Sequence, residues 1–508
     1  PAEEYMSTDF AVVSPDTPLL AIQKIIVGNN QRFVPVVEKG KIIGGITRTD
    51  LLRVMQSDLM KKPSYLYSSG HDPRFTRKKS VYKLMKERLD KRIFETLQAL
   101  GKKADALHYN AYLTGGIVRD LILRRENLDV DIVVEGDGIE LAKQFSKDCS
   151  CKVKSYKKFG TATLIFPDGF RIDIATARLE YYESPAALPT VEHSSIKLDL
   201  YRRDFTMNTL AIRLNPAGFG ELIDFFGGQK DIKERMIRVI HNLSFVEDPT
   251  RIFRAIRFEQ RFGFHIGRHT IKLIKNAVKM NFLDQLDGYR FFSELVHIFE
   301  EEEPIPVIKR LVELDILRFI HPRIQFNEKK KKTLENIRDV ISWYDLLFLE
   351  EKYEKWLIYF SGLVDSLNKQ EIREVCKRLS MTEKNEKRVI KGIQEAESTL
   401  RRIDKSSKIE KSAIYRILKP LPTETLLYSM AQTDKKHIRK AISIYFTQLK
   451  STKLHINGEN LKSMGITPGI IFKEIMDALM EAKLDGRVET KEDEIKFVKE
   501  NFIGAVEA

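Results

Sequence analysis

Two aspartates that stand two residues apart are the first candidates for chemistry. Asp129 and Asp131 lie in the run Leu-Asp-Val-Asp-Ile-Val-Val, which predicts a β-strand over residues 128–134. Side chains two apart on a strand point to the same face, so the two carboxylates project together while Val130 and Ile132 enter the core. Carboxylates this close repel each other unless a cation lies between them. We therefore predict that Asp129 and Asp131 are catalytic acids that bind Mg²⁺, a hard ion that prefers oxygen ligands.

A third carboxylate is expected from a neighbouring strand. Asp173 stands among apolar residues in Phe-Arg-Ile-Asp-Ile-Ala, and a buried acid needs a metal or a cationic side chain nearby. We predict a catalytic role for Asp173, and a salt bridge, for instance to Arg178, is the alternative. In a two-metal site, ions roughly 3.5–4 Å apart activate an attacking hydroxyl and neutralise the leaving pyrophosphate. Two Mg²⁺ ions are therefore expected.

A pair of glycines lies upstream of these acids, between a predicted strand and a predicted helix. Gly115 and Gly116 lack side chains, so the backbone can approach a triphosphate and direct its N–H groups toward it. Arg119 on the following helix could add positive charge. We predict that these three residues bind a nucleotide. The alternative is a tight strand-to-helix turn followed by a solvated Arg119.

A group of polar side chains follows in the run Tyr-Arg-Arg-Asp-Phe-Thr-Met-Asn. Arginine forks suit phosphate oxygens, and aspartate and asparagine suit ribose hydroxyls. Arg203, Asp204 and Asn208 are therefore predicted to bind the same nucleotide. An aspartate that caps a helix is the alternative for Asp204.

A second acid and arginine open a predicted helix. Asp248 fits the N-cap and Pro249 the first helical position, so capping explains part of this motif. Asp248 and Arg251 are three apart, which lets both face one ligand. A carboxylate accepts from the exocyclic amine of cytosine or adenine and arginine donates to the adjacent ring nitrogen, whereas uracil and guanine present a carbonyl and a ring N–H there. We predict that this pair selects C and A, and that Arg254 and Arg257 also bind the nucleotide.

The elements that position these residues divide the chain into parts. Strand-like and helix-like segments alternate over residues 110–240, an amphipathic helix is expected over residues 81–101, and beyond Thr250 the sequence reads as helix after helix. The fold class is α+β, with a mixed α/β head followed by an all-α neck, body and tail. The expected parts are residues 1–60 (a small α/β module), 61–80 (linker), 81–240 (head), 241–300 (neck) and 301–508 (body and tail).

Composition narrows the choice of partner and compartment. Lys plus Arg number 86 against 72 for Asp plus Glu, and the net charge of +14 favours an anionic partner such as nucleic acid, with a solvated basic surface as the alternative. Basic clusters such as residues 329–332 are more often solvated faces than contacts. Three cysteines make no disulfide framework, and there is neither a secretory signal nor an apolar run that could cross a bilayer. We expect a cytoplasmic protein without membrane association.

Several blocks between Leu113 and Phe258 resemble, in the same order, the bacterial class II tRNA nucleotidyltransferases, which include CCA-adding, CC-adding and A-adding enzymes and poly(A) polymerases. The blocks are "GGIVRD", "DVDIVV", "RIDIATAR", "RRDFTMNTL", "IDFFGGQKDIKERMIR" and "FVEDPTRIFRAIRF". The resemblance implies metal binding by Asp129 and Asp131. It further implies triphosphate and ribose contacts from the "RRD" segment and Asn208, and base reading by Asp248 and Arg251. It also implies that the partners are the tRNA 3′ end and ATP, or ATP and CTP. The C-terminal "INGENLKSMGITPGIIFKEIMDALMEAKLDGRVETKEDE" is similar to the tRNA-binding tail of these enzymes.

The N-terminal module resembles one CBS repeat, most clearly in "RFVPVVEKGKIIGGITRTDLL". Strands are expected at residues 33–37 and 42–46, split by Lys39-Gly40, after a helix over residues 18–27. CBS repeats normally work in pairs. We therefore expect either self-association through this module or a further domain upstream of residue 1.

The product of the reaction is a separate question. A CBS unit ahead of the transferase domain resembles the long bacterial form, which includes enzymes that add only the terminal A. We therefore expect A addition from ATP, with complete CCA addition or poly(A) synthesis as alternatives. A catalytically inactive RNA-binding protein that senses adenine nucleotides is the alternative of a different class, and the intact acid pair argues against it.

Overall fold

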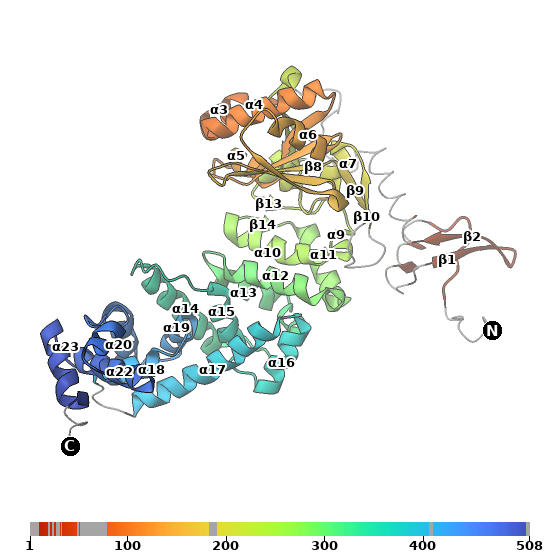
Figure 1. Ribbon diagram of the computed structural model, residues 1–508. Helices are drawn as coiled ribbons and strands as arrows, with labels where there is room; N and C mark the ends of the chain where they lie inside the picture. Colours follow the sequence, from red (N-terminus) through yellow and green to blue (C-terminus); the bar gives the residue numbers. More distant parts are fainter. Residues whose placement is uncertain are drawn as a thin grey trace, which may run out of the picture. The chain divides into compact units, whose positions relative to one another are not determined.

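The structure of this chain is a computed structural model with two compact units, Pro1–Leu286 and Asp287–Ala508. The described residues are 10–18, 21–22, 25–26, 31, 33–47, 50, 79–181, 190–405 and 410–503. Figure 1 colours them along the chain, from the N-terminal strands to the C-terminal helices. The first unit contains the sheets, and the second unit is helical throughout its described part. The predicted α+β class is confirmed.

The N-terminal module contains a two-stranded antiparallel sheet. β1 (Phe33–Glu38) and β2 (Lys41–Thr47) are joined at Lys39 and Gly40, which both have positive φ, as the sequence predicts. The buried residues beneath the sheet are Val13, Ile22, Ile26 and Val34. Of the helix predicted over residues 18–27, residues 18, 21–22 and 25–26 are described. Residues 21–22 and 25–26 are helical, and Pro18 is not. Most of the expected linker lies outside the described residues.

The head is built on an eight-stranded sheet in the order β3-β12-β11-β4-β5-β8-β7-β6. β5 and β8 are parallel, and the other neighbours are antiparallel. The strands are β3 (Lys79–Ser80), β4 (Asn110–Thr114), β5 (Val130–Glu135), β6 (Lys152–Tyr156), β7 (Thr161–Ile165), β8 (Arg171–Thr176), β11 (Leu210–Arg213) and β12 (Glu221–Asp224). β9 (Arg178–Tyr181) and β10 (Thr190–His193) form a separate hairpin. Because β3 belongs to the sheet, the sheet begins inside the expected linker.

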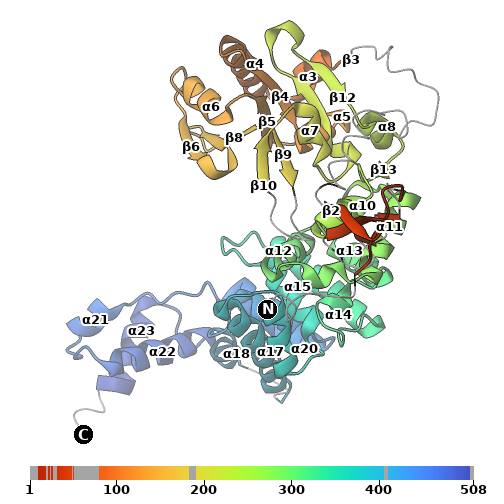
Figure 2. The same ribbon diagram turned by 90° about the vertical axis from the view of Figure 1, so that its right-hand side faces the viewer.

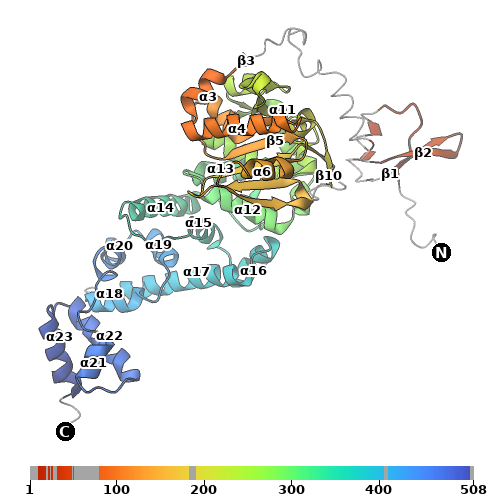
Figure 3. The same ribbon diagram turned by 45° about the horizontal axis from the view of Figure 1, so that its top comes forward.

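Helices cover both faces of this sheet. α4 (Lys91–Ala106) and α6 (Gly138–Ser146) contact each other, and both lie in front of the strands in Figure 3. α7 (Ile196–Tyr201) packs its apolar residues on Tyr112, Val133 and Ala211. Because side chains alternate along a strand, Asp131 shares the face of Val133. The predicted catalytic acids therefore lie on the α7 side of the sheet.

The helix expected over residues 81–101 is two helices. α3 (Tyr82–Arg88) ends at Leu89, whose backbone is extended, and α4 then begins. The side chain of Asp90 accepts a hydrogen bond from the backbone N–H of Arg92 and so caps α4. The apolar spacing continues across this break, which explains why periodicity alone predicts a single helix.

The first unit ends in helices that the sequence assigned to the neck. α9 (Ser244–Glu247), α10 (Thr250–Phe262) and α11 (Arg268–Lys279) follow the head, joined to it by the short parallel pair β13 (Met236–Ile237) and β14 (His265–Ile266). β14 was not expected, because the sequence beyond Thr250 predicts helices. Residues 241–286 thus form one compact unit with the head, and the remainder of the expected neck belongs to the second unit.

The second unit is a succession of helices. They are α12 (Gly288–Phe299), α13 (Pro304–Glu313), α14 (Glu328–Asp345), α15 (Lys355–Val364), α16 (Lys369–Arg378), α17 (Glu383–Asp404), α18 (Lys411–Leu418), α19 (Thr423–Ala431), α20 (Lys436–Ile444), α21 (Gly458–Ser463), α22 (Ile470–Leu484) and α23 (Lys491–Val498). The last three share an apolar cluster that includes Ile456, Leu461, Ile475 and Val498, and they lie together in Figure 2. No described helix is long and apolar enough to cross a membrane.

Candidate active site

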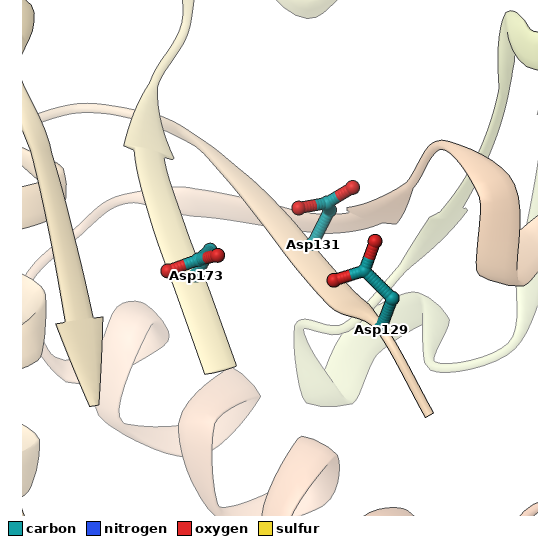
Figure 4. A group of neighbouring side chains, drawn as sticks. All are labelled: Asp129, Asp131 and Asp173. Atoms are coloured by element: carbon teal, nitrogen blue, oxygen red, sulfur yellow. The ribbon is translucent and has the colours of Figure 1, made fainter. Parts of the chain in front are cut away.

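Three aspartates meet on the α7 face of the head sheet. Asp129 immediately precedes β5, Asp131 lies within it, and Asp173 lies on the parallel strand β8. The register pairs Asp131 directly with Asp173, which places their side chains on the same face. One carboxylate oxygen from each residue can be chosen so that all three lie within 4.8 Å of one another. Figure 4 shows the three side chains grouped across the two strands.

The electrostatics of this cluster favour a bound cation. Burial, together with the negative charge of Asp129, raises the pKa of Asp131 to about 6, and the positive charge of Arg203 opposes the shift. Asp173 accepts a hydrogen bond of 2.5 Å from the hydroxyl of Thr163 on β7. The donor set consists of carboxylate oxygens, which suits a hard divalent ion. Arg178, the predicted alternative partner of Asp173, donates instead to the Phe159 carbonyl.

The glycine turn brings backbone beside this cluster. Gly115 precedes α5 (Gly116–Ile122) with φ of 80°, a conformation that favours glycine. A Cβ atom at Gly115 would lie 2.9 Å from Oδ2 of Asp131 and 3.3 Å from Nη1 of Arg203. A side chain at this position would therefore displace either the carboxylate or the guanidinium. This close approach explains the need for glycine at the first of the two positions.

Arg119 is buried rather than solvated, so the alternative considered for it is wrong. Its side chain is paired with Asp120, donates from Nη1 to Oδ1 of Asn208 at 2.8 Å, and is 5% exposed. Its guanidinium carbon lies 5.3 Å and 4.5 Å from the ring centroids of Phe258 and Phe262 on α10. Arg119 therefore joins the head to the helix that carries the predicted base-reading residues.

The "RRD" segment is organised around an acid that the sequence reading did not single out. Asp199 is fully buried on α7 and pairs with Arg202 (2.7 Å) and Arg203 (3.3 Å). Although burial alone raises its pKa, the charges of Arg202 and Arg203 hold the pKa of Asp199 below its ordinary value. Arg203 also donates to the hydroxyl of Thr114 at the end of β4. Asp199 thus positions Arg203 beside Asp131.

Asp204 accepts hydrogen bonds from both Asn208 and Arg254. Asn208 donates to Oδ1 of Asp204 at 2.9 Å, and Arg254 donates from Nε to Oδ2 at 2.8 Å. Burial raises the pKa of Asp204, but the charge of Arg254 and the hydrogen bonds from Asn208 and Arg254 bring it below its ordinary value. The alternative of a simple helix cap does not account for these contacts. Asp204 therefore links the head to α10.

The predicted base-reading pair lies at the start of α10. Pro249 is the N-cap, one residue later than expected, and Asp248 accepts from the backbone N–H and hydroxyl of Thr250. Arg251 is 4% exposed and donates to the Ser244 hydroxyl (2.8 Å) and the Arg202 carbonyl (2.7 Å). Capping thus explains part of the role of Asp248. Arg251 is held in one orientation between α9 and the "RRD" segment.

Two further residues of this region are Arg257, which the sequence predicts to bind the nucleotide, and His241, which no sequence pattern singles out. Arg257 is buried on α10, so it presents little surface to solvent. The side chain of His241 is 7% exposed, its ring stacks on that of Tyr201 with centroids 5.0 Å apart, and its Nε2 lies 3.4 Å from Oε2 of Glu247. Burial and the positive charge of Arg251 lower the pKa of His241 to about 3, so its ring is neutral near pH 7. A lone histidine after an apolar run carries no signal that would have identified it.

Comparison with protein families identifies three regions of the chain. Residues 111–238 match the Poly A polymerase head domain, residues 2–57 match the CBS domain, and residues 263–327 match the Probable RNA and SrmB- binding site of polymerase A. The first of these regions contains the aspartate cluster and the "RRD" segment. The second covers the N-terminal module.

Similar proteins extend over nearly the whole chain. The A-adding tRNA nucleotidyltransferase of Geobacter sulfurreducens is 48% identical over 98% of this chain and 57% of its own length. The A-adding tRNA nucleotidyltransferase of Aquifex aeolicus is 34% identical over 95% of this chain and 55% of its own length. The chain therefore spans little more than half the length of these curated relatives.

Solved structures match over almost their entire length. An apo form of a CCA-adding enzyme is 39% identical with a TM-score of 0.68, and the match covers 84% of this chain and 99% of that one. The Thermotoga maritima CCA-adding enzyme complexed with tRNA is 36% identical with a TM-score of 0.66 and the same coverage. Identity at this level over a whole relative, together with the order of the motifs, shows that the chain belongs to the family of class II tRNA nucleotidyltransferases and poly(A) polymerases.

Proposed function

We propose that this chain adds a nucleotide to the tRNA 3′ end without a template, and that the nucleotide is the terminal A from ATP. The observation that carries the proposal is the aspartate cluster, three carboxylates within 4.8 Å beside the turn at Gly115 and the guanidinium of Arg203. The relatives from Geobacter sulfurreducens and Aquifex aeolicus, which match over 98% and 95% of this chain, are both named A-adding tRNA nucleotidyltransferases. Because the chain spans only part of their length, the activity is a proposal for this chain.

The donor set of the cluster suits Mg²⁺, and we propose two ions held by Asp129 and Asp131, with Asp173 as the third acid. Bound metal would activate the attacking 3′-hydroxyl of the RNA and neutralise charge on the leaving pyrophosphate. The protein contributes the geometry, because the register of β5 and β8 fixes two of the three carboxylates.

The nucleotide would lie between the cluster and α10. Arg203, held by Asp199 and Thr114, would contact the triphosphate, with the backbone at Gly115 and Gly116 close by. Asp204 and Asn208 would meet the ribose. Both side chains are already oriented by protein contacts, so little reorganisation accompanies nucleotide binding.

Selection of the base would fall to Asp248 and Arg251. Contacts to Ser244 and the Arg202 carbonyl fix the plane of the Arg251 guanidinium. A fixed donor beside a carboxylate acceptor matches the edges of adenine and cytosine and opposes those of guanine and uracil. Arg254 and Arg257, on the same helix, would add positive charge toward the triphosphate.

Complete CCA addition is the second candidate function. It is favoured by the solved structures, which include CCA-adding enzymes in complex with ATP and with CTP. The same acid and arginine would serve both bases, so the site itself accommodates either product. With tRNA as the partner, a cytoplasmic location is proposed as well. Self-association through the N-terminal module remains a prediction.

One assay separates these functions. The purified chain is given tRNA transcripts that lack the CCA end, end after the first C, or end after the second C, with each nucleotide supplied singly. An A-adding enzyme extends only the last transcript, and only with ATP. Incorporation of CTP into the shorter transcripts would establish CCA addition instead. Failure to extend any transcript would exclude both activities and leave the RNA-binding alternative.

A further inference from the structure

A chain of hydrogen bonds runs from the aspartate cluster into the interior of the head. The backbone N–H of Asp129 donates to Oδ1 of Asn127 at 2.8 Å, and Nδ2 of Asn127 donates to Oδ2 of Asp120 at 2.6 Å. Asn127 therefore joins a residue of the cluster to a carboxylate on α5. Its amide is oriented from both ends, since one end accepts and the other donates.

Asp120 is the next member of this chain. Its two oxygens accept from Nε and Nη2 of Arg119, both at 2.9 Å, in a bidentate pair. The side chains of Arg119 and Asp120 are 7% and 9% exposed. Within this pair the carboxylate fixes the plane of the guanidinium. The remaining terminal nitrogen, Nη1, is thereby directed at Asn208.

The chain continues from Asn208 to α10. Asn208 accepts from Arg119 and donates to Oδ1 of Asp204, and the other oxygen of Asp204 accepts from Nε and Nη2 of Arg254 at 2.8 and 2.7 Å. Asp204 is buried as well. An uninterrupted relay thus connects the backbone of Asp129 to an arginine of the base-reading helix.

We propose that Asp120 and Asn127 are positioning residues that couple the aspartate cluster to α10. The inference rests on the proposed function, and it goes beyond it because neither residue contacts the nucleotide in the arrangement described above. Asp120 fixes the orientation of the Arg119 side chain. Arg119 in turn orients Asn208, and Asn208 orients Asp204. Asn127 accepts a hydrogen bond from the backbone N–H of Asp129 and so fixes the backbone from which the Asp129 carboxylate projects. A change at Asp120 is therefore transmitted in both directions, to the acids and to the base-reading helix.

The first experiment compares Asp120→Asn and Asn127→Ala with the wild type. Asparagine at position 120 keeps the shape but turns an N–H₂ group toward a donor, so the bidentate pair is lost. We expect each variant to lower kcat by roughly tenfold to a hundredfold and to narrow the preference for ATP over GTP and UTP. The matched control is Asp137→Asn. Asp137 caps α6 in the same domain, and asparagine can keep that cap, so this variant makes the same change of side chain without touching the relay.

A double-mutant cycle tests whether the effect passes through the relay. Asp120→Asn is combined with Arg254→Ala. In the wild type, the side chains of these two residues are connected through Arg119, Asn208 and Asp204 along the relay. If the relay transmits the effect, Asp120→Asn reduces kcat at least threefold less in the Arg254→Ala background than in the wild type. Additive effects, or an unchanged base preference in Asp120→Asn, would show that Asp120 serves only the stability of the head.

Calorimetric titration with ATP and Mg²⁺ makes the inference testable even without turnover. Asp120→Asn and Asn127→Ala should weaken ATP–Mg²⁺ binding at least fivefold relative to Asp137→Asn, with each protein's folded fraction measured by circular dichroism. Equal affinity in all three folded proteins would overturn the coupling. A wild type that binds ATP–Mg²⁺ but extends no transcript would contradict the proposed function while leaving this comparison intact.

Discussion

The head contains two groups of three aspartates, and the surroundings of the two groups differ. The cluster aspartates, Asp129, Asp131 and Asp173, face one another. The paired aspartates, Asp120, Asp199 and Asp204, each face an arginine. The paired group is the more deeply buried, and yet the pKa of Asp199 and of Asp204 is lowered while that of Asp131 is raised to about 6.

This contrast shows that burial alone does not set the charge of a carboxylate. Burial raises the pKa of both Asp131 and Asp199, and the sign of the net shift of each follows the charge of the nearest side chains. Arginine partners compensate the paired aspartates within the protein itself. The cluster aspartates retain mutual repulsion, which an external cation can relieve. The first group suits metal binding, and the second suits the positioning of arginines.

The largest expected effect is on chemistry at the cluster. Asp129→Ala or Asp131→Ala should lower nucleotide addition to below about 1% of the wild type, because the metal ligands are lost. Binding of tRNA, measured by filter retention, should be nearly unchanged. Asp168→Ala is the matched control, since Asp168 pairs with Arg92 on the surface of the head and should retain activity. More than a few per cent activity in both cluster variants would remove these residues from the metal site.

The next effect is on stability, and it belongs to the paired group. Asp199→Ala leaves Arg202 and Arg203 without their buried partner and should cost about 3–5 kcal/mol of folding free energy. Urea denaturation followed by far-ultraviolet circular dichroism measures this loss of folding free energy. Asp129→Ala should show no comparable loss. Equal stability of the two variants would mean that the arginines are not compensated by Asp199.

Metal binding should depend on pH through Asp131. Below a pKa of about 6 the residue carries a proton that the ion must displace, so the apparent Mg²⁺ affinity should fall by roughly tenfold per pH unit below that value. Between its ordinary pKa of 3.8 and about 6, the metal-free folded state holds a proton that the unfolded state has released. Stability of the metal-free protein therefore falls as pH rises through this window. Mg²⁺ should accordingly raise Tm more at pH 7.5 than at pH 5, and a pH-independent gain would contradict the raised pKa.

The smallest effect is the relief of repulsion in the cluster. Asp129→Asn removes one of the charges that raise the pKa of Asp131. Without metal, the variant should melt roughly 1–3 °C above the wild type at pH 7.5. Saturating Mg²⁺ should reverse the order, because only the wild type keeps all its ligands. Scanning calorimetry with and without Mg²⁺ measures both values, and a lower Tm in the metal-free variant would show that the repulsion is not significant.

The two groups also differ in how far sequence could predict them. Asp129 and Asp131 follow from a local rule, because residues two apart on a strand share a face in any sheet. Asp173 was predicted as a buried acid, but it is exposed, and its place beside Asp131 depends on the parallel pairing of β5 with β8. For Asp199 the sequence showed only an acid before two arginines. Its burial beneath both of them is a property of the packed helix α7.

The helical unit provides the same lesson at a basic residue. Lys330 lies in a run of lysines that reads as a solvated face, and yet its side chain is buried, donates to the Gly362 carbonyl and pairs with Asp365. Asp365 also accepts from Tyr428 and Gln432. Four adjacent lysines give no period from which an inward-facing member could be chosen. The contacts with Gly362 and Asp365 determine that Lys330 is the lysine that faces inward.

By itself, the sequence determined the features that depend on short spacing: the Asp-x-Asp strand, the need for glycine ahead of α5, the turn at Lys39-Gly40, and the α+β order of the elements. Only the tertiary structure decided which acids face one another and which face arginines. The reason is that the charge state of a carboxylate depends on partners within a few ångströms, and for Asp131 and Asp204 those partners include residues distant in sequence. Arg119 and Arg254, for example, are joined through Asn208 and Asp204 by folding alone.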